Sequence, residues 1–288
     1  MVSRRCVLVG YGYWGRIISR YLKDAGFDPV SVFDRHAQIP FEKFLKDAQA
    51  DTVFICSPVS THYEYVKASL QSGCDVFCEK MLTADPAKAK ELFGLADEKG
   101  RVLFTDYIYL YSPSIRKMKE LISEMGQLRA IRGEIHQNGK IYEDVDVIGN
   151  IGVHMISAAG FLTDFKDVAG SSVKVSGFSE VPLKECVLDY SVGEISVSIS
   201  SSLVSDEKTR KLSAYGAGGE LDFDMTKEIT LVRRPELQEY SYDEANNLVN
   251  SLRAFCKCMD EPTGDEYALN RTCCSYTEHL AYLAHAEI

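Results

Sequence analysis

The feature that most constrains the fold is a glycine motif directly after a short apolar run near the N-terminus. Residues 6–9 (CVLV) are followed at once by residues 10–15 (GYGYWG), and apolar side chains then recur at helical spacing over residues 16–25. This order predicts a strand, a glycine turn and a helix. Gly10 permits the tight turn, Gly12 leaves room for a pyrophosphate, and Gly15 lets the helix pack closely on its strand.

The same stretch predicts a dinucleotide site. Phosphates bind the unpaired N–H groups at the start of such a helix, so we expect contacts from Gly10, Gly12, Tyr13, Trp14 and Gly15. The next apolar run, residues 30–33, ends in Asp34, which is placed to accept hydrogen bonds from a ribose diol. Its negative charge favours NAD over NADP. Arg35 follows it, and because an arginine there can hold a 2′-phosphate, NADP stays open as the cofactor.

Composition narrows the class of protein. A chain of 288 residues favours two domains, and a formal net charge of −10 disfavours nucleic acid and anionic membranes as partners. No apolar run is long enough to span a membrane, and the run after Arg4 and Arg5 is too short for a signal peptide. Nine cysteines without regular spacing suit a reducing cytoplasm. Cys256, Cys258, Cys273 and Cys274 suggest zinc at first sight, but their spacing favours free thiols, so no metal is expected.

The order of elements predicts an α/β protein in two parts. Strands and helices alternate in the first part, which is typical of a parallel sheet built from βαβ units. The expected strands are 6–9, 30–33, 51–56, 75–78 and 101–109, and the helices are 16–25, 41–48, from 60 or 61 to 73, 86–99 and 113–125. We therefore predict a Rossmann domain over residues 1–122.

From residue 128 the pattern changes to strands with few helices between them. The expected strands are 128–135, 172–179, 186–192, 194–203, 211–217, 220–223 and 229–233, with helices at 148–162, 243–259 and 267–287. Tight turns are expected at residues 192–194 and 216–219. This predicts an α+β domain over residues 123–288 that is built on an open, mainly antiparallel sheet.

Ligands of an open parallel sheet bind beyond the carboxyl ends of its strands, where Ser57, Pro58, Glu79 and Lys80 are expected. Lys80 is the sharpest candidate, because an ammonium near a nicotinamide carbon can give a proton to a carbonyl oxygen or hold an alcohol oxygen. The alternative is a surface lysine paired with Glu79.

His154 is the second candidate acid/base group. It follows Asn150 by four residues on the predicted helix 148–162, so the amide can orient the imidazole. The alternative is a core histidine with satisfied hydrogen bonds. His62 lies near the start of a predicted helix, and we expect it to be a structural residue or to lie next to the cofactor. Four tyrosines either line a pocket or belong to the core: Tyr107, Tyr109, Tyr111 and Tyr142.

The whole order of motifs resembles the glucose–fructose oxidoreductase / inositol dehydrogenase family, Gfo/Idh/MocA. Four segments carry the resemblance: residues 10–15, residues 56–62 (CSPVSTH), residues 73–80 (GCDVFCEK) and residues 152–154 (GVH). The resemblance implies NAD(P)-dependent oxidation or reduction of sugars and polyols, and a C-terminal sheet that mediates homodimers or homotetramers. It also implies that Lys80 is the catalytic lysine and His154 the acid/base histidine. Residues expected around the nicotinamide half are Ser57, Pro58, Thr61, His62 and Glu79.

The chain departs from the family pattern at four positions. Met81 replaces the usual proline, Ile108 and Leu110 replace polar residues of the expected pocket, and Asn150 replaces an aspartate. An amide can orient His154 but cannot stabilise an imidazolium by charge.

These departures motivate two alternatives to a sugar dehydrogenase: a non-catalytic dinucleotide sensor or scaffold, and a reductase of a less polar imine or enone. The resemblance implies a sugar-like substrate without naming it, and the cysteine usage favours a cytoplasmic protein.

Overall fold

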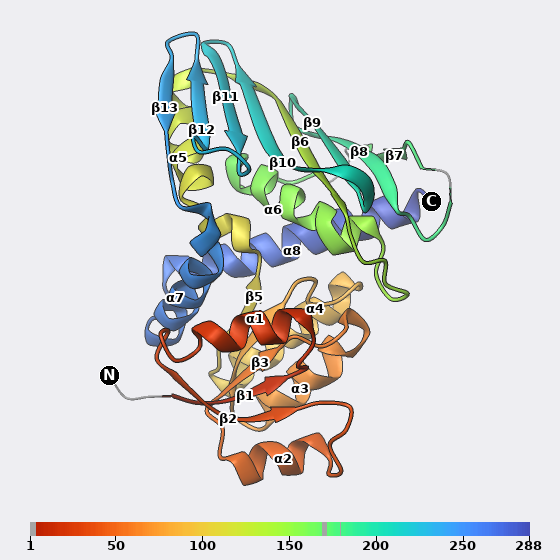
Figure 1. The fold of residues 1–288 in the computed structure, drawn as a ribbon, viewed down its shortest axis with the longest axis vertical. Helices are drawn as coiled ribbons and strands as arrows, with labels where there is room; N and C mark the ends of the chain where they lie inside the picture. The colour runs from red at the N-terminus through yellow and green to blue at the C-terminus, as the bar shows by residue number, and fades with distance from the viewer. Residues whose placement is uncertain (1–3, 169–171, 179) are drawn as a thin grey trace. The chain divides into compact units, whose positions relative to one another are not determined.

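The computed structural model describes residues 4–168, 172–178 and 180–288, which form two compact units (Figure 1). Unit 1 consists of Met1–Tyr107 and Leu248–Ser275, and unit 2 consists of Ile108–Asn247 and Tyr276–Ile288. Unit 1 thus takes up a helical segment from late in the chain. A division into independently folding domains at residue 122 stays a prediction.

Unit 1 contains a five-stranded parallel sheet, sheet A, in the order β2-β1-β3-β4-β5. The strands are β1 (Arg4–Val9), β2 (Phe27–Phe33), β3 (Thr52–Ile55), β4 (Asp75–Glu79) and β5 (Leu103–Asp106). From β1 the chain adds β2 on one side and β3 on the other. This change of direction between β1 and β3 is where open α/β sheets bind ligands. The predicted α/β class and parallel sheet are confirmed.

The crossover helices are α1 (Tyr13–Tyr21), α2 (Phe41–Ala48), α3 (His62–Gln71) and α4 (Pro86–Lys99). The bounds of α4 agree with the sequence because its signals are strong. Asp85 caps the first turn by accepting from the Ala87 N–H at 2.9 Å, and Gly100 ends the helix at φ 60°. The strand expected over 101–109 ends at Asp106, because a 3₁₀ turn, η2 (Ile108–Tyr111), follows.

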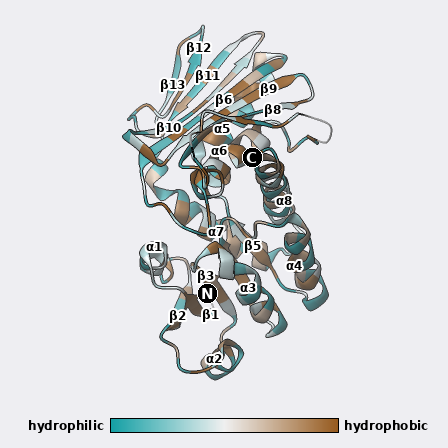
Figure 2. Ribbon diagram, turned by 90° about the vertical axis from the view of Figure 1, so that its right-hand side faces the viewer, coloured by the Kyte–Doolittle hydropathy of each residue, from teal (hydrophilic) through white to brown (hydrophobic). Residues whose placement is uncertain are grey.

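The helix α7 (Asn247–Asp260) belongs to the core of unit 1. Phe255 is fully buried, and its ring centroid lies 5.5–6.0 Å from those of one phenylalanine on each of four strands: Phe27, Phe54, Phe77 and Phe104. The strands of sheet A are correspondingly coloured as hydrophobic in Figure 2. Buried aromatic area of this size dominates the energetics of a core.

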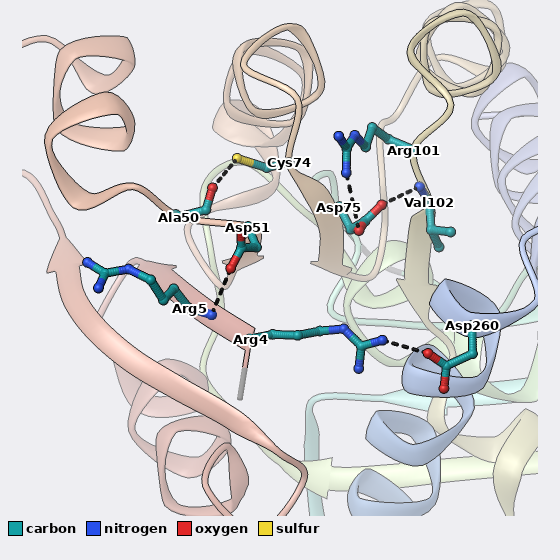
Figure 3. Close-up of polar contacts among 9 residues, drawn as sticks. All are labelled: Arg4, Arg5, Ala50, Asp51, Cys74, Asp75, Arg101, Val102 and Asp260. Carbon is teal, nitrogen blue, oxygen red and sulfur yellow. Dashed lines mark hydrogen bonds and ion pairs between the residues drawn. The ribbon is translucent and has the colours of Figure 1, made fainter. Parts of the chain in front are cut away.

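Polar contacts at the amino ends of the strands hold the same unit together (Figure 3). Arg4 at the start of β1 donates to Asp260 of α7 at 2.6 Å. Asp75 accepts from the Val102 N–H at 2.8 Å, and burial raises the pKa of its carboxyl. These contacts join strand ends to neighbouring segments and leave the carboxyl ends of the strands for other roles.

Unit 2 contains an eight-stranded sheet, sheet B, in the order β13-β12-β11-β10-β6-β9-β8-β7. Only β6 and β9 pair in parallel, so the predicted mainly antiparallel sheet is confirmed. The strands are β6 (Leu128–Asn138), β7 (Lys174–Ser176), β8 (Glu185–Val192), β9 (Ile195–Ser202), β10 (Val204–Gly216), β11 (Gly219–Asp224), β12 (Leu231–Arg234) and β13 (Gln238–Tyr240). Residue 179 of the expected strand 172–179 lies outside the described residues.

Two-residue turns join β8 to β9 and β10 to β11, as the glycines predict, since Val192 pairs with Ile195 and Gly216 with Gly219. The helices of unit 2 are α5 (Pro113–Ile122) and α6 (Val153–Leu162), followed by residues 276–286 of α8 (Asp265–Ala286). On β9, Val197 and Ile199 are buried while serines alternate with them, as expected for a sheet with one covered face. No helix in the described ranges has both the length and the apolar character needed to cross a bilayer.

Asp146 fixes the start of the segment that leads into α6. Its carboxylate accepts from the N–H groups of Ile148 and Gly149 at 3.0 and 3.2 Å, and lies 3.0 Å from Nε2 of His285 near the end of α8. The hydrogen bond to this carboxylate raises the pKa of His285. The chain end of unit 2 is thereby coupled to the helix that carries His154.

We predict that Phe255→Ala lowers the free energy of unfolding by about 3–5 kcal/mol, because it leaves a cavity among four rings. Urea unfolding followed by circular dichroism measures this. Phe178→Ala, at a side chain that is 38% exposed, is the control and should cost far less. Similar losses for both variants would show that α7 is not part of the core of unit 1.

We predict that the ion pair of His285 stabilises the chain below about pH 6.5 and that its contribution is lost as pH rises through the raised pKa of the folded state. His285→Gln keeps a neutral donor. The free energy of unfolding of the wild type should therefore exceed that of the variant by up to about 1 kcal/mol near pH 6, since the pair is partly exposed, and equal it near pH 9. A difference independent of pH would contradict the pairing.

Candidate functional site

The residues predicted to bind a dinucleotide lie along the carboxyl-end edge of sheet A. The register pairs the last residues of β2, β1 and β3, namely Phe33, Val9 and Ile55, and continues through β4 to β5. Side chains that end or follow these strands therefore occur across the sheet in the order Asp34, Gly10, Ser57, Lys80 and Asp106. At about 4.8 Å between neighbouring strands, the edge from β2 to β5 extends over roughly 19 Å.

The glycine turn has the geometry that the motif predicts. Gly10 has φ +86°, and a Cβ on Gly15 would lie 2.1 Å from the Gly10 carbonyl oxygen. A Cβ on Gly12, in contrast, would have no protein atom within 4 Å. The turn is thus closed on its inner side by protein and open at Gly12, where a ligand can approach the backbone.

The helix α1 begins directly at this opening. Gly12 is its N-cap and supplies no side-chain hydrogen bond, so the first N–H groups of the helix can bind an anion. Tyr13 is 75% exposed and its ring meets that of Trp14 edge-on at 5.9 Å. Both side chains therefore stand beside the open turn, as a cofactor contact requires.

Asp34 is half-buried at the end of β2, and its Oδ1 accepts the His36 N–H at 2.8 Å. Its second carboxylate oxygen can serve a ribose diol. Arg35 is exposed, with Nε 3.4 Å from Nε2 of His36. The guanidinium is thus accessible beside Asp34, and the choice between NAD and NADP rests on both residues.

The segment after β3 is held by short polar contacts. The Thr61 hydroxyl lies 2.7 Å from both the Ser57 hydroxyl and the Pro58 carbonyl oxygen. His62 is 1% exposed, and its Nδ1 and Nε2 lie 2.7 and 2.9 Å from the carbonyl oxygens of Met81 and Ser57. A neutral ring can donate to only one of the two. His62 therefore connects the segment after β3 to the turn beside Lys80, which favours its structural interpretation.

Lys80 follows β4 and is half-buried, next to two buried carboxyl groups. Glu79 is 8% exposed, and its register partner on β5 is Asp106, which is 1% exposed. Laterally paired residues of a sheet project from the same face, so the two carboxyl groups are neighbours. These buried, acidic surroundings disfavour the interpretation of Lys80 as an ordinary surface lysine, and a catalytic role of Lys80 stays a prediction.

Burial shifts the pKa of all three groups toward neutrality. It lowers the pKa of Lys80, against the opposing effect of the charges on Glu79 and Asp106. It raises the pKa of Glu79, which the charge of Asp106 raises further, and it raises the pKa of Asp106. An amine with a lowered pKa can both donate and accept a proton near neutral pH.

Sequence reasoning missed Asp106 and Ser251. Asp106 is the last residue of a buried strand, and Asp34 is the first residue after one. The position of Asp106 in the sequence could therefore have marked it as a candidate site residue. Ser251 of α7 donates to Oδ1 of Asp106 at 2.5 Å. No local pattern marks Ser251, because the contact joins residues 145 positions apart.

His154 belongs to unit 2, on α6. All residues of this helix are buried except His154 and Phe161, which are half-buried, and the Nδ1 atom of His154 is itself buried. Its ring meets that of Tyr109 edge-on at 5.3 Å. Partial burial fits both interpretations of His154, so its acid/base role stays a prediction.

Asn150 lies on a π-helical turn, Ile148–Gly152, that directly precedes α6. Such turns occur often at functional sites. The Asn150 amide donates to the Lys140 carbonyl oxygen at 3.3 Å. Its predicted role in orienting His154 stays a prediction.

Several residues that were expected to line the pocket are buried in the core instead. Tyr107, Tyr109 and Tyr111 are at most 3% exposed, and Leu110 is fully buried. Met81 is 3% exposed and follows Lys80 through a cis peptide bond. None of the nine cysteines forms a disulfide, and no group of metal-ligating side chains occurs within the described ranges.

Comparison with known proteins agrees with this geometry. Residues 4–107 match a family described as "Oxidoreductase family, NAD-binding Rossmann fold", the Gfo/Idh/MocA family. The chain is 29% identical over 157 residues to dTDP-3,4-didehydro-2,6-dideoxy-alpha-D-glucose 3-reductase of Actinomadura kijaniata, covering 51% of this chain and 45% of the reductase. It is 30% identical over 129 residues to biliverdin reductase A of Mus musculus, covering 41% and 44%. The aligned stretches thus span less than half of these relatives.

The fold is shared over a longer range. The crystal structure of UDP-N-acetylglucosamine 3-dehydrogenase from Acidithiobacillus ferrooxidans superposes with a TM-score of 0.84 at 21% identity, covering 100% of this chain and 99% of that one. The predicted pair of a parallel Rossmann sheet and a mainly antiparallel sheet is therefore a known architecture. Residues 4–107, which carry the parallel sheet, are therefore similar to the NAD-binding Rossmann fold of the Gfo/Idh/MocA oxidoreductase family.

Proposed function

We propose that this protein is an NAD(P)-dependent oxidoreductase that acts on a hydroxyl or keto carbon of a sugar, amino sugar or cyclitol-like substrate. One observation carries the proposal. Asp34, the open glycine turn and Lys80 come directly after β2, β1 and β4, at the same edge of sheet A. Asp34 would hold the adenosine ribose of a dinucleotide bound along this edge, Gly12 would leave space for its pyrophosphate, and Ser57 and Lys80 would lie on the side of its nicotinamide.

The residues present fit the cofactor. Gly12 is open where a pyrophosphate needs space, and the carboxylate of Asp34 suits a ribose diol. We propose NAD as the preferred cofactor, with NADP as the alternative that Arg35 would serve. The nicotinamide, when bound, supplies or accepts the hydride.

Lys80 handles the proton in this proposal. In reduction, the ammonium donates a proton to the carbonyl oxygen as it becomes a hydroxyl. In oxidation, the neutral amine accepts the hydroxyl proton. Both directions are accessible because burial lowers the pKa of Lys80. His154 is proposed as a second acid/base group that assists or relays, with Asn150 as its orienting partner.

The substrate class follows the relatives. The Actinomadura kijaniata relative is named as a reductase of a dTDP-linked sugar, and the Acidithiobacillus ferrooxidans neighbour as a dehydrogenase of UDP-N-acetylglucosamine. Both names place the chemistry at a sugar carbon. We propose the same class here, without a particular sugar. A cytoplasmic location and a homodimer or homotetramer through sheet B are further proposals.

A second candidate is reduction of a substrate that is not a sugar. The similarity to mouse biliverdin reductase A favours it, together with the apolar, half-buried Ile108. A third, a dinucleotide sensor without catalysis, is disfavoured by Lys80 and His154, since a pure binder needs neither. Assays with sugar nucleotides, free sugars, keto sugars and biliverdin separate the three. Cofactor binding without turnover of any of them would favour the sensor.

We predict that Gly12→Ala weakens NAD binding by about tenfold or more while the melting temperature stays nearly unchanged. The new methyl group would contact no protein atom within 4 Å and would occupy the space proposed for the pyrophosphate. Gly15→Ala should destabilise the fold, since its Cβ would clash with the Gly10 carbonyl. Calorimetric titration with NAD and thermal unfolding measure both effects.

Gly94→Ala, on α4 with nothing within 4 Å, is the matched control and should bind NAD like the wild type. Unchanged NAD affinity in Gly12→Ala would place the pyrophosphate elsewhere.

We predict that Lys80→Met lowers kcat by about 10²–10⁴, the usual effect of removing one proton-transfer group, while NAD affinity changes little. Lys90→Met, at an exposed position of α4, is the control and should retain full turnover. Steady-state rates and NAD titration give the two values. Equal turnover in Lys80→Met and wild type would remove Lys80 from the mechanism.

A further inference from the structure

We propose that Asp106, held by Ser251, is a positioning residue that keeps the Lys80 ammonium charged and oriented in the folded chain. This inference rests on the proposed function, because it concerns the proton donor of that reaction. It goes beyond that function by assigning roles to two residues outside the motifs of the glycine turn and the Glu79-Lys80 segment.

Geometry supports the pairing first. Asp106 ends β5 and pairs in register with Glu79, the residue before Lys80. Its carboxyl is 1% exposed, and only Oδ1 has a hydrogen-bond partner, the Ser251 hydroxyl at 2.5 Å. Oδ2 is buried and has none. A carboxylate oxygen without a donor in a buried place costs free energy unless a nearby positive charge compensates it.

Charge supports it second. Lys80 is the positive group that acts on Asp106. Burial lowers the pKa of Lys80, and the negative charges of Glu79 and then Asp106 oppose that effect. The Ser251 hydrogen bond lowers the pKa of Asp106, so it favours the ionised carboxylate that Lys80 needs. Ser251 therefore acts on Lys80 through Asp106.

Asp106 shares its effect on the pKa of Lys80 with Glu79, whose charge has the larger effect. Glu79 from β4 is the second carboxyl, and the charge of Asp106 raises its pKa, so the two carboxyl groups compete for ionisation. Burial raises the pKa of the Cys56 thiol well above its usual range, and Cys78 of β4 is a buried thiol. His62 of α3 contacts carbonyl oxygens. A hydrogen bond favours the charged form of both carboxyl groups: the Lys80 backbone N–H donates to Glu79, and the Ser251 side chain donates to Asp106. Of these two donors, only Ser251 can be removed by a side-chain substitution.

The test is the pKa of Lys80 in cofactor-free protein, measured by NMR titration of labelled lysine side chains and assigned with Lys80→Met. Asp106→Asn should lower this pKa by about one pH unit, the effect of removing one close opposite charge. Ser251→Ala should lower it by a smaller amount, because Asp106 stays but ionises less readily. Ser69→Ala, a buried serine of α3 that donates to the Tyr65 carbonyl at 2.6 Å, is the control and should not move it.

The same variants have an activity readout if turnover is found. Reduction needs protonated Lys80, so the rate falls as pH rises through its pKa. In Asp106→Asn this fall should occur about one pH unit lower, which is up to about a tenfold loss of kcat above the pKa, with KM nearly unchanged. A mere loss of stability would lower rates at every pH without moving the profile.

The outcomes separate this inference from the proposed function. A lowered pKa of Lys80 without any turnover would support the pairing and count against the oxidoreductase. Turnover that depends on Lys80 but an unchanged pKa in both Asp106→Asn and Ser251→Ala would overturn the pairing and leave the function standing. If Asp106→Asn does not fold, Ser251→Ala decides alone.

Discussion

The parallel register of sheet A is the constraint on which the site depends. Because the five strands run in one direction and end at nearly the same level, the residues after them are brought to one edge from positions as far apart as Gly10 and Asp106. An edge of this kind presents backbone groups and strand-end side chains that the sheet itself does not use. The amino ends carry structural contacts such as that of Arg4 with Asp260, and we propose the ligand site at the other edge.

The edge becomes specific through burial. Aromatic side chains of sheet A pack against the buried ring of Phe255 on α7. In such surroundings Glu79, Lys80 and Asp106 cannot keep the ionisation they have in water, and the pKa of each moves toward neutrality. In the proposed function, the burial that stabilises the fold also lowers the pKa of the Lys80 amine. Removing the aromatic core would affect both properties.

The sequence allowed the fold to be predicted where local signals are strong. Asp85, Pro86 and Gly100 mark both ends of α4, and the glycines near 193 and 217 mark two-residue turns. The prediction was less accurate where the start or end of a helix or strand depends on tertiary packing. The strand expected to reach residue 109 stops at Asp106, and α1 begins at Tyr13, three residues before its first expected position, because the glycine turn itself caps it. The short strand β13 was missed, since three residues carry little periodic signal.

Part of the site was likewise readable in advance. The spacing in the sequence was enough to predict the glycine motif and Asp34. The contacts of Ser251 with Asp106 and of His62 with Met81 join segments that are distant in the sequence, so no local pattern predicts them. The central claim is that a dinucleotide lies along this edge with its nicotinamide at Lys80. A crystal structure of the chain with NAD tests it most directly. The account predicts the pyrophosphate at the start of α1 and the Lys80 amine within about 4 Å of the reacting side of the nicotinamide ring. A nicotinamide bound away from Lys80, or a pyrophosphate away from Gly12, would contradict it.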